Sequence, residues 1–373
     1  MSRVVYLKEL IEIKNGKDYR KLEKGKIPVY GTGGVIAYVN DFLYDGESIL
    51  LPRKGSLNNI MYVDNDKFWT VDTMYWSVVK KEKVYPKYLF CYLSLLNLSS
   101  RDTGSTLPSM TFDSYYTLPI KLYDYEIQKK IGDLYFKLTQ KIELNNKINS
   151  ELEAMAKTIY DYWFLQFEFP NEEGKPYKSS GGKMVWNNEL KREIPEGWEV
   201  KKLEDYCNIF TGRKDVNQAL EKGKYKFYSC SPNYKFSNDK LYEGKAILIA
   251  GNGSYTGRTI FVNEAIDLYQ RTYACVSKNT LEYMEYLYYT LLKFFVPIVS
   301  GGTHGSAIPY IVLNDIAKQK ILINKSIIEK FQDILVPIQN KIFKLKLENE
   351  ELTSLRDFLL PLLMNGQVGF KGE

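Results

Sequence analysis

Glu126 to Phe164, EIQKKIGDLYFKLTQKIELNNKINSELEAMAKTIYDYWF, is the stretch of sequence that decides the fold. Apolar or bulky residues recur in it with the alternating three- and four-residue spacing of a coiled-coil seam. It therefore predicts one long helix with a narrow apolar stripe. The stripe consists of Ile131, Leu134, Leu138, Ile148, Leu152, Met155, Ile159 and Tyr162.

A second stretch, Ser326 to Met364, repeats this pattern at a shift of 200 residues, with matches such as Lys130/Lys330. One such helix alone is about as consistent with an ordinary amphipathic core helix. Two matching seams in one chain, however, are most simply buried against each other. The second seam consists of Phe331, Ile334, Ile338, Leu345, Leu352, Leu355, Leu359 and Leu362.

Antiparallel packing of these two helices would place the two halves of the chain at opposite ends of the pair. A helix of about 36 residues is roughly 54 Å long, and one turn of B-DNA is about 34 Å. The pair would then set two related domains one to two turns apart on a duplex. Pro337 lies inside the second stretch, so that helix is expected to begin near Val336 or to kink there.

The remainder of the first half also recurs in the second half. Asp45 to Ser56, DGESILLPRKGS, matches Glu243 to Ser254, EGKAILIAGNGS, at a shift of 198, and the loop from Gly104 to Met110 matches Gly305 to Ile311 at 201. Shifts that drift by so few residues indicate a tandem duplication with small loop insertions. Each copy would be a globular domain followed by one seam helix.

Within the first copy, short β-type runs alternate with glycine or Asn/Asp turns, and one helix is expected to begin at a proline. The fold class is therefore α/β, in the mixed α+β sense. The expected strands are 28–30, 48–51, 59–63 and 74–79, with a helix over 86–96. The expected organisation is a first domain at 1–125, a helix at 126–168, a connector loop at 169–197, a second domain at 198–325, and a helix with the C-terminal tail at 326–373.

Composition sets bounds on function. A net charge of +6 permits a local nucleic-acid footprint without demonstrating one. The four cysteines are far apart and the chain has a single histidine, which argues against a zinc site or a disulfide framework and favours a reducing cytoplasm. No apolar run approaches the roughly 18 residues of a membrane span, so we expect no membrane association.

The sequence contains only weak matches to catalytic motifs. The glycine-rich stretches Gly31 to Gly34 and Gly251 to Gly257 do not have the GxxxxGK[ST] spacing of a phosphate loop, so tight turns are the preferred interpretation. Asp239, Glu243 and Lys245 resemble a nuclease triad, but the first copy has Glu47 where the lysine would be. We therefore interpret these charges as surface residues around a turn, and expect no catalytic or metal-binding residues.

The chain resembles the specificity (S) subunit of type I restriction-modification systems. The resemblance rests on the twofold repeat of domain plus helix, on the connector FPNEEGKPYKSSGGKMVW, on the restart IPEGWEVKKLEDYCNIFTGR, and on the passages from GSTLPSM and GSAIPYI into the helices. It covers essentially the whole chain. One departure is the absence of a tryptophan in the first copy at the place of Trp198.

The resemblance implies a non-catalytic subunit that binds double-stranded DNA, with each target recognition domain reading one half of a bipartite sequence. It also implies two methyltransferase (M) subunits that modify adenine, and restriction (R) subunits joined through the complex. S-adenosylmethionine, ATP and Mg would be bound by those partners and not by this chain. The alternatives are a specificity module of a type IIB or IIG system, a stand-alone nuclease or methyltransferase, or a helical scaffold.

Candidate DNA contacts are loop residues with cationic or hydrogen-bonding ends, because arginine and asparagine can make paired contacts to guanine and adenine while Lys, Ser and Thr suit phosphates. Each taken singly is more often a solvated loop residue. The candidates are Arg53, Lys54, Ser56, Asn58, Arg101, Thr106 and Ser109 in the first copy, and Arg213, Lys214, Asn252, Ser254, Arg258, Arg271, Thr303, His304 and Ser306 in the second.

Overall fold

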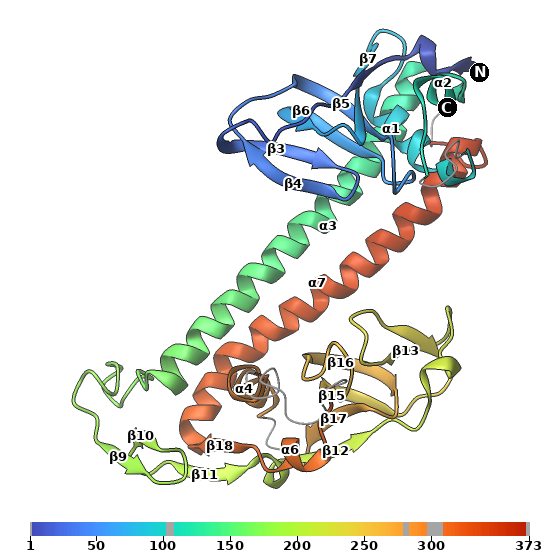
Figure 1. Ribbon diagram of the computed structural model, residues 1–373. Helices are drawn as coiled ribbons and strands as arrows, with labels where there is room; N and C mark the ends of the chain where they lie inside the picture. Colours follow the sequence, from blue (N-terminus) through green and yellow to red (C-terminus); the bar gives the residue numbers. More distant parts are fainter. Residues whose placement is uncertain (1, 102–107, 279–282, 297–308, 371–373) are drawn as a thin grey trace. The chain divides into compact units, whose positions relative to one another are not determined.

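Two compact units make up the chain in the computed structural model, which describes residues 2–101, 108–278, 283–296 and 309–370. Unit 1 comprises Met1–Leu144 with Glu348–Glu373, and unit 2 comprises Asn145–Leu347. Each unit therefore contains one copy of the duplicated sequence together with segments of both long helices. Figure 1 shows the elements of each unit.

Unit 1 is built on a six-stranded sheet with the strand order β2-β7-β5-β6-β3-β4 (Figure 1). All neighbours in it are antiparallel except β3 and β6, which are parallel. Strands β1 and β8 form a separate two-stranded sheet. The strands are β1 (Arg3–Tyr6), β2 (Ile11–Asn15), β3 (Lys24–Gly31), β4 (Gly34–Val39), β5 (Tyr44–Pro52), β6 (Met61–Thr70), β7 (Met74–Val79) and β8 (Pro119–Leu122), and the short helices are α1 (Pro86–Ser94) and α2 (Phe112–Tyr116).

Unit 2 repeats this topology, with the strand order β12-β17-β15-β16-β13-β14 and a parallel pair, β13 and β16, at the matching place. A two-stranded sheet of β11 and β18 corresponds to β1 and β8. The duplication inferred from the sequence is thus confirmed. The elements are β11 (Glu199–Lys202), β12 (Cys207–Thr211), β13 (Tyr225–Tyr228), β14 (Lys235–Ser237), β15 (Tyr242–Ala250), β16 (Thr259–Leu268), β17 (Thr272–Ser277), β18 (Lys320–Ile323), α4 (Met284–Thr290) and α6 (Leu313–Ala317).

The same hydrogen bond fastens the short helix to the two-stranded sheet in both units. The Tyr88 hydroxyl on α1 donates to the carbonyl of Lys121, and the Tyr286 hydroxyl on α4 donates to that of Leu322. Both tyrosines are buried, and burial raises the pKa of each phenol well above its usual value, so both stay protonated donors. The strands predicted at 28–30, 48–51 and 74–79 and the helix from Pro86 are confirmed by β3, β5, β7 and α1, whereas the strand predicted at 59–63 is β6, which begins at Met61 and continues to Thr70.

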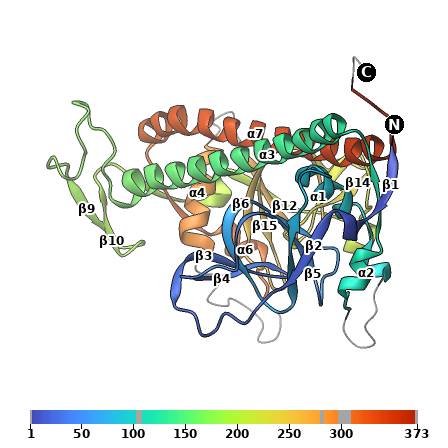
Figure 2. The ribbon, with the colours of Figure 1, turned by 90° about the horizontal axis from the view of Figure 1, so that it is seen from above.

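Two long helices, α3 (Tyr125–Tyr160) and α7 (Lys325–Asn365), contribute to both units. Within unit 1, the beginning of α3 packs against the end of α7, where Ile131 joins Leu360 and Leu363 in one buried cluster. Within unit 2, the end of α3 meets the beginning of α7, since the ring centres of Tyr160 and Phe331 are 6.1 Å apart. In each unit the two segments therefore run antiparallel (Figure 2).

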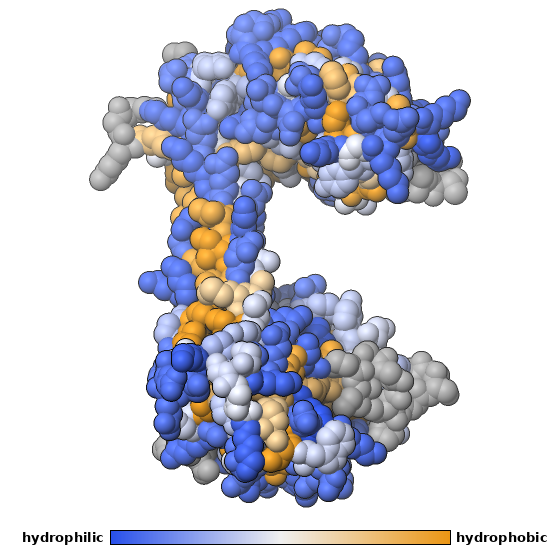
Figure 3. Space-filling view, turned by 90° about the vertical axis from the view of Figure 1, so that its left-hand side faces the viewer, coloured by the Kyte–Doolittle hydropathy of each residue, from blue (hydrophilic) through white to orange (hydrophobic). Residues whose placement is uncertain are grey.

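The predicted seams are only partly right in phase. Met155, Ile334 and Leu355 are 40–46% exposed, whereas Asn145 and Ile342 are fully buried. A straight helix has 3.6 residues per turn, so a strict seven-residue repeat drifts around its surface over 36 residues. Apolar side chains that drift away from the contact face are exposed, and Figure 3 shows apolar surface along the helical segments.

Polar contacts supplement this packing. Lys141 forms an ion pair with Glu348 at 3.4 Å in unit 1, and Lys346 pairs with Glu153 at 3.0 Å in unit 2. The Asn349 side chain donates to the carbonyl of Ile142 at 3.4 Å. Polar side chains of the two helices, such as Lys141 and Glu348, therefore meet each other within the helical pair.

Pro337 lies within the continuous helix α7, so the first of the two expectations, a start near Val336, was wrong, and the alternative, a kink at this residue, stays a prediction. Proline lacks a backbone N–H and so cannot make the usual bond to the residue four positions earlier, which is Asp333 here. Tertiary packing outweighs this loss, since Phe331 and Leu335, on the turns before Pro337, are fully buried in the unit 2 core.

The spacing of the two domains on a duplex stays a prediction.

The connector was expected to be a loop, and this was wrong in part. It contains a hairpin of β9 (Met184–Asn187) and β10 (Arg192–Pro195), and it follows a five-residue π-helix, Asp161–Leu165. Phe169 and Ile194 are buried in the core of unit 2 with Trp198. The glycine, proline and charge content hid these apolar anchors, because composition averages over single residues.

Candidate nucleic-acid interface

The loop that follows β5 in unit 1 is held against the segment that precedes α2. The Gly55 N–H donates to the Pro108 carbonyl at 2.9 Å, and the Met110 N–H donates to the Arg53 carbonyl at 3.0 Å. Lys54 and Ser109 form an antiparallel bridge between these bonds. We call these two segments the unit 1 loop pair.

Unit 2 has the same arrangement after β15 and before α6. The Gly253 N–H donates to the Pro309 carbonyl at 3.1 Å, the Ile311 N–H donates to the Gly251 carbonyl at 2.9 Å, and Asn252 bridges Tyr310. A Cβ atom at Gly251 would lie 2.3 Å from the Arg271 carbonyl oxygen, so only glycine fits there. We call these two segments the unit 2 loop pair. The close approach at Gly251 supports the interpretation of the glycines in Gly251 to Gly257 as turn residues.

Within the unit 1 loop pair, the candidate residues divide into anchored and free side chains. The Arg53 guanidinium donates to the Asp72 carbonyl at 3.3 Å and lies 5.8 Å from the centre of the Tyr75 ring. Asn58 accepts from the Ser99 N–H at 3.1 Å. The Lys54 ammonium is exposed, and among the described residues it has no ion-pair or hydrogen-bond partner.

Within unit 2, Arg258 is the anchored arginine. Its guanidinium donates to the Ser231 carbonyl, and burial lowers its pKa. Asn252 accepts from the Cys230 thiol at 3.1 Å. Ser254 is exposed on the loop between them, and Ser56 is exposed at the equivalent place in unit 1.

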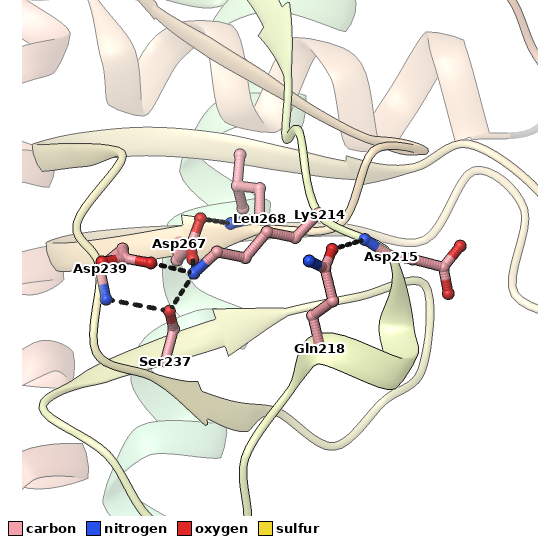
Figure 4. A network of polar contacts seen from close by, with 7 residues as sticks. All are labelled: Lys214, Asp215, Gln218, Ser237, Asp239, Asp267 and Leu268. Atoms are coloured by element: carbon pink, nitrogen blue, oxygen red, sulfur yellow. Dashed lines mark hydrogen bonds and ion pairs between the residues drawn. The ribbon is translucent and has the colours of Figure 1, made fainter.

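Lys214 is the centre of a polar network (Figure 4). Its ammonium lies 2.7 Å from a carboxylate oxygen of Asp239, 2.7 Å from one of Asp267, and 2.6 Å from the Ser237 hydroxyl. Burial lowers the pKa of Lys214, but its hydrogen bonds to the two carboxylates outweigh that effect, so the pKa is raised overall. A DNA phosphate would have to compete with both carboxylates for this ammonium.

Arg213 and Arg271 are exposed, and within the described part of unit 2 neither guanidinium has a partner. Arg271 borders a hollow of about 210 Å³ together with Gly251, Gln270, Tyr273 and Ile311. The Gln270 side chain donates to Asp215 at 3.0 Å, which holds this rim in place. A free arginine beside an open hollow can form a bidentate pair with a phosphate or with the edge of guanine.

Some predicted contacts lie outside the described residues, namely Thr106, Thr303, His304 and Ser306; Arg101 is described only as the last residue of a short helix, Leu98–Arg101. The DNA-contact role of every candidate stays a prediction. The sequence analysis did not predict that Gln270 and Tyr310 lie beside the candidate residues of unit 2.

Gln270 could have been found because it directly precedes Arg271. Tyr310 could have been found because it occupies the position of Ser109 in the repeated loop, although the two residues differ in type.

The three charges that resembled a nuclease site do not converge. Asp239 contacts Lys214, Glu243 pairs with Lys240 at 2.6 Å, and Lys245 pairs at 2.9 Å with the buried Glu285. Among the described residues, no group of three or more His, Cys, Asp or Glu side chains has the arrangement of a metal site. Neither long helix, nor any shorter one in the described ranges, has the apolar length needed to cross a bilayer.

Comparisons with known proteins agree with this architecture. The family model described as "Type I restriction modification DNA specificity domain" matches residues 2–154 and again residues 195–355. The two matches coincide with the two copies of the duplicated sequence. They cover well over half of the chain.

Several curated relatives align along most of their length. The type I restriction enzyme MjaIX specificity subunit of Methanocaldococcus jannaschii is 26% identical over 347 residues, covering 86% of this chain and 77% of that protein. The HindI specificity subunit of Haemophilus influenzae is 24% identical over 421 residues, covering 88% and 86%.

Among solved structures, the type I restriction-modification S subunit from M. genitalium is similar with a TM-score of 0.67 at 18% sequence identity. The superposition covers 97% of this chain and 96% of that one. At this level of identity the likeness shows the fold. It confirms the predicted fold class of mixed α/β units joined to long helices.

Proposed function

The chain belongs to the type I restriction modification DNA specificity family, and from this premise we propose that each of its units binds one half of a bipartite DNA target. As a type I specificity subunit, it would supply base recognition to a restriction-modification complex. The bound DNA would be double-stranded.

The observation that carries this proposal is the repeated loop pair. Each unit holds the loop after its central strand, β5 or β15, against the segment before its short helix by matching backbone bonds. Each also presents exposed cations near this pair, Lys54 in unit 1 and Arg271 in unit 2. A rigid scaffold that carries variable loops is the usual means by which one fold reads different ligands.

The chemistry is proposed to belong to partner subunits. Two methyltransferase subunits would bind S-adenosylmethionine and modify adenine, and restriction subunits would join through the complex and use ATP and Mg. The chain itself would be non-catalytic and would act in the cytoplasm. The diverging contacts of Asp239, Glu243 and Lys245 support the view that these residues stabilise the domain.

A domain exchange tests independent reading by the two units. Residues 1–125 are replaced by the matching domain of a relative with a known target, and the methylated sequence is determined in cells that make the partner methyltransferase. One half of the recognised sequence should change and the other should stay. A reciprocal exchange of residues 198–325 is the matched control and should change the opposite half.

Alteration of both halves by either exchange would contradict the proposal. A separate assay addresses catalysis: the purified chain is incubated with DNA, Mg and S-adenosylmethionine without partners. No cleavage and no methyl transfer are expected. Robust activity of the chain alone would favour an enzyme with an unrecognised site.

A further inference from the structure

A cavity of about 390 Å³ lies in unit 2, away from the residues that form the loop pair. Its volume falls within the roughly 300–1,000 Å³ that is typical of small-molecule sites. The walls combine rings with a few polar groups, which is the usual make-up of such sites. They include Tyr160, Phe164, Tyr286, Thr290, Phe294 and Leu322.

Arg192, the first residue of β10, contributes a cation to this cavity. Its guanidinium lies 5.3 Å from the ring centre of Phe167 and 5.3 Å from that of Phe294. In the part of unit 2 that the structure describes, it has no carboxylate or carbonyl partner. Two aromatic rings hold the cation without using its N–H donors.

An arginine in this state, which is partly buried, has lost some of its solvation without gaining a hydrogen-bonded counter-ion. Burial lowers the pKa of Arg192, which reports the loss of water around the charge. Buried charges are ordinarily paired and hydrogen-bonded, because removing them from water is costly. The donors of Arg192 are therefore available to a ligand that carries two coplanar acceptor oxygens.

The mouth of the cavity is also cationic. Lys318 and Lys320 line it together with Glu189, whose carboxylate lies 3.4 Å from the Lys320 ammonium. With Arg192 included, three cations face one carboxylate. This balance favours an anionic ligand over a neutral or cationic one.

The corresponding position in unit 1 carries a larger side chain. Thr290 of α4 corresponds to Tyr92 of α1, and the Tyr92 hydroxyl reaches to 3.5 Å from the Pro119 carbonyl on β8. In unit 2 the smaller Thr290 instead accepts a hydrogen bond from Tyr160 at 3.1 Å. The cavity between α4 and β18 is thus present where this position carries threonine.

We propose that this cavity binds a small ligand made of an oxyanion, a carboxylate or a phosphate, attached to an apolar or aromatic body. Arg192 receives the oxyanion through paired N–H donors, and Lys318 strengthens the attraction at the mouth. The apolar body lies against Phe164 and Leu322. This site is separate from the proposed DNA contacts and does not depend on them.

Calorimetric titration of the full chain tests the proposal with three probes: benzoate, phenyl phosphate and inorganic phosphate. Benzoate and phenyl phosphate distinguish the two oxyanions, and inorganic phosphate shows what the anion binds without an apolar body. Saturable binding of at least one aromatic probe is expected. Arg192→Met should weaken that binding by about tenfold or more, because it removes charge-assisted hydrogen bonds.

Three further variants make the test specific. Arg192→Lys keeps the charge but loses the planar fork, so it should weaken binding by a smaller factor. Thr290→Tyr copies the side chain of unit 1 and should abolish binding by filling the cavity. Lys330→Met removes an exposed cation on α7 in the same unit and should leave binding unchanged.

Failure of both aromatic probes to bind the unaltered chain would overturn the proposal. Equal binding by the unaltered chain, Arg192→Met and Thr290→Tyr would overturn it as well. Circular dichroism establishes that each variant is folded. If Arg192→Met does not fold, the test uses Arg192→Lys and Thr290→Tyr. Weaker binding by both of these variants supports the proposal. Binding equal to that of the unaltered chain overturns it.

Discussion

The end of the sheet formed by β3, β4 and β6 in unit 1 and the matching end in unit 2 have the same strand order but opposite chemistry. In unit 1, Val29, Val39 and Trp69 form a buried apolar cluster. At the positions of Val39 and Trp69, unit 2 carries Ser237 and Asp267, which contact the Lys214 ammonium (Figure 4).

The strand register is nevertheless retained. Val29 faces Trp69 across the parallel pair of unit 1, as Phe227 faces Asp267 across that of unit 2. The comparison teaches that backbone pairing sets this topology, while the stabilising interaction at one end can be either apolar burial or an ion-pair network. The following predictions test whether the two solutions differ as their chemistry requires.

The largest effect is expected from Trp69→Ala in unit 1. Truncating a buried aromatic side chain removes apolar contacts and leaves a cavity, so the free energy of unfolding should fall by about 3–5 kcal/mol. Loss of the hydrogen bond from the Trp69 indole to the Lys17 carbonyl, 2.8 Å long, adds to this. Denaturant unfolding measures the change, which should be insensitive to salt; a strong salt dependence would contradict apolar stabilisation.

Lys214→Met in unit 2 should have the next largest effect. It leaves the carboxylate of Asp267, whose side chain is 6% exposed, without its cation. The expected loss is about 2–3 kcal/mol, somewhat below the usual cost of breaking a buried pair because Lys214 itself is partly exposed. Asp239→Asn is the matched control; that carboxylate is 79% exposed, so its removal should cost less than about 1 kcal/mol.

This loss should depend on pH in a defined direction. The folded pKa of Lys214 is raised above the ordinary value of about 10.5, so its contribution is present below that pH and is lost as the pH rises through the folded pKa. The difference in stability between the unaltered chain and Lys214→Met should therefore be constant near neutrality and shrink once the pH rises above the ordinary lysine pKa and through the raised, folded one. A difference that grows with alkaline pH would be inconsistent with the network.

Arginine side chains offer a smaller contrast between the units. Arg271 is exposed without a partner among the described residues, whereas Arg53 is tied to the Asp72 carbonyl and the Tyr75 ring. Arg271→Ala should weaken DNA binding by the assembled complex by about 1–2 kcal/mol and reduce its salt dependence, without lowering thermal stability. Arg53→Ala should instead lower thermal stability. Identical effects of the two changes on stability would remove the distinction.

The smallest effect is expected from the double variant Lys214→Met with Asp267→Leu. Replacing both members of a buried ion pair by apolar groups is often close to neutral, so stability should stay within about 1 kcal/mol of the unaltered chain. The double variant should thus be more stable than Lys214→Met alone. If the double variant is instead less stable than Lys214→Met, the contacts of Lys214 with both carboxylates form one cooperative network. Apolar side chains could then not replace that network in unit 2 as they do in unit 1.

The sequence was sufficient for the architecture because repetition and periodicity are carried by many residues at once. The match of Asp45–Ser56 with Glu243–Ser254 located equivalent strands and loops, and the seams located α3 and α7. The phase of the seams was less well predicted, since Met155 and Leu355 satisfy the spacing and are exposed. The rotation of a helix about its axis depends on neighbours distant in the chain, and in α3 it places the polar Asn145 on the buried face.

Contacts of single residues were harder to predict, because they also depend on segments that are distant in the chain. Lys214 and Arg271 look equally suited to DNA in the sequence, yet one is surrounded by carboxylates that come from β16 and from the segment after β14. Arg192 stood in a stretch interpreted as a loop, and its two aromatic neighbours are 25 and 102 positions away in the chain. Contacts between distant segments leave no local pattern.

The central claim is that the two units read two separate half-sites, and the methylated genome of cells that make this chain with its methyltransferase partner tests it most directly. Single-molecule sequencing should find methylated adenine in a split motif, with two defined halves separated by unspecified bases. Deleting the gene for the chain should remove that methylation. An uninterrupted motif, or methylation that persists without the chain, would contradict the account.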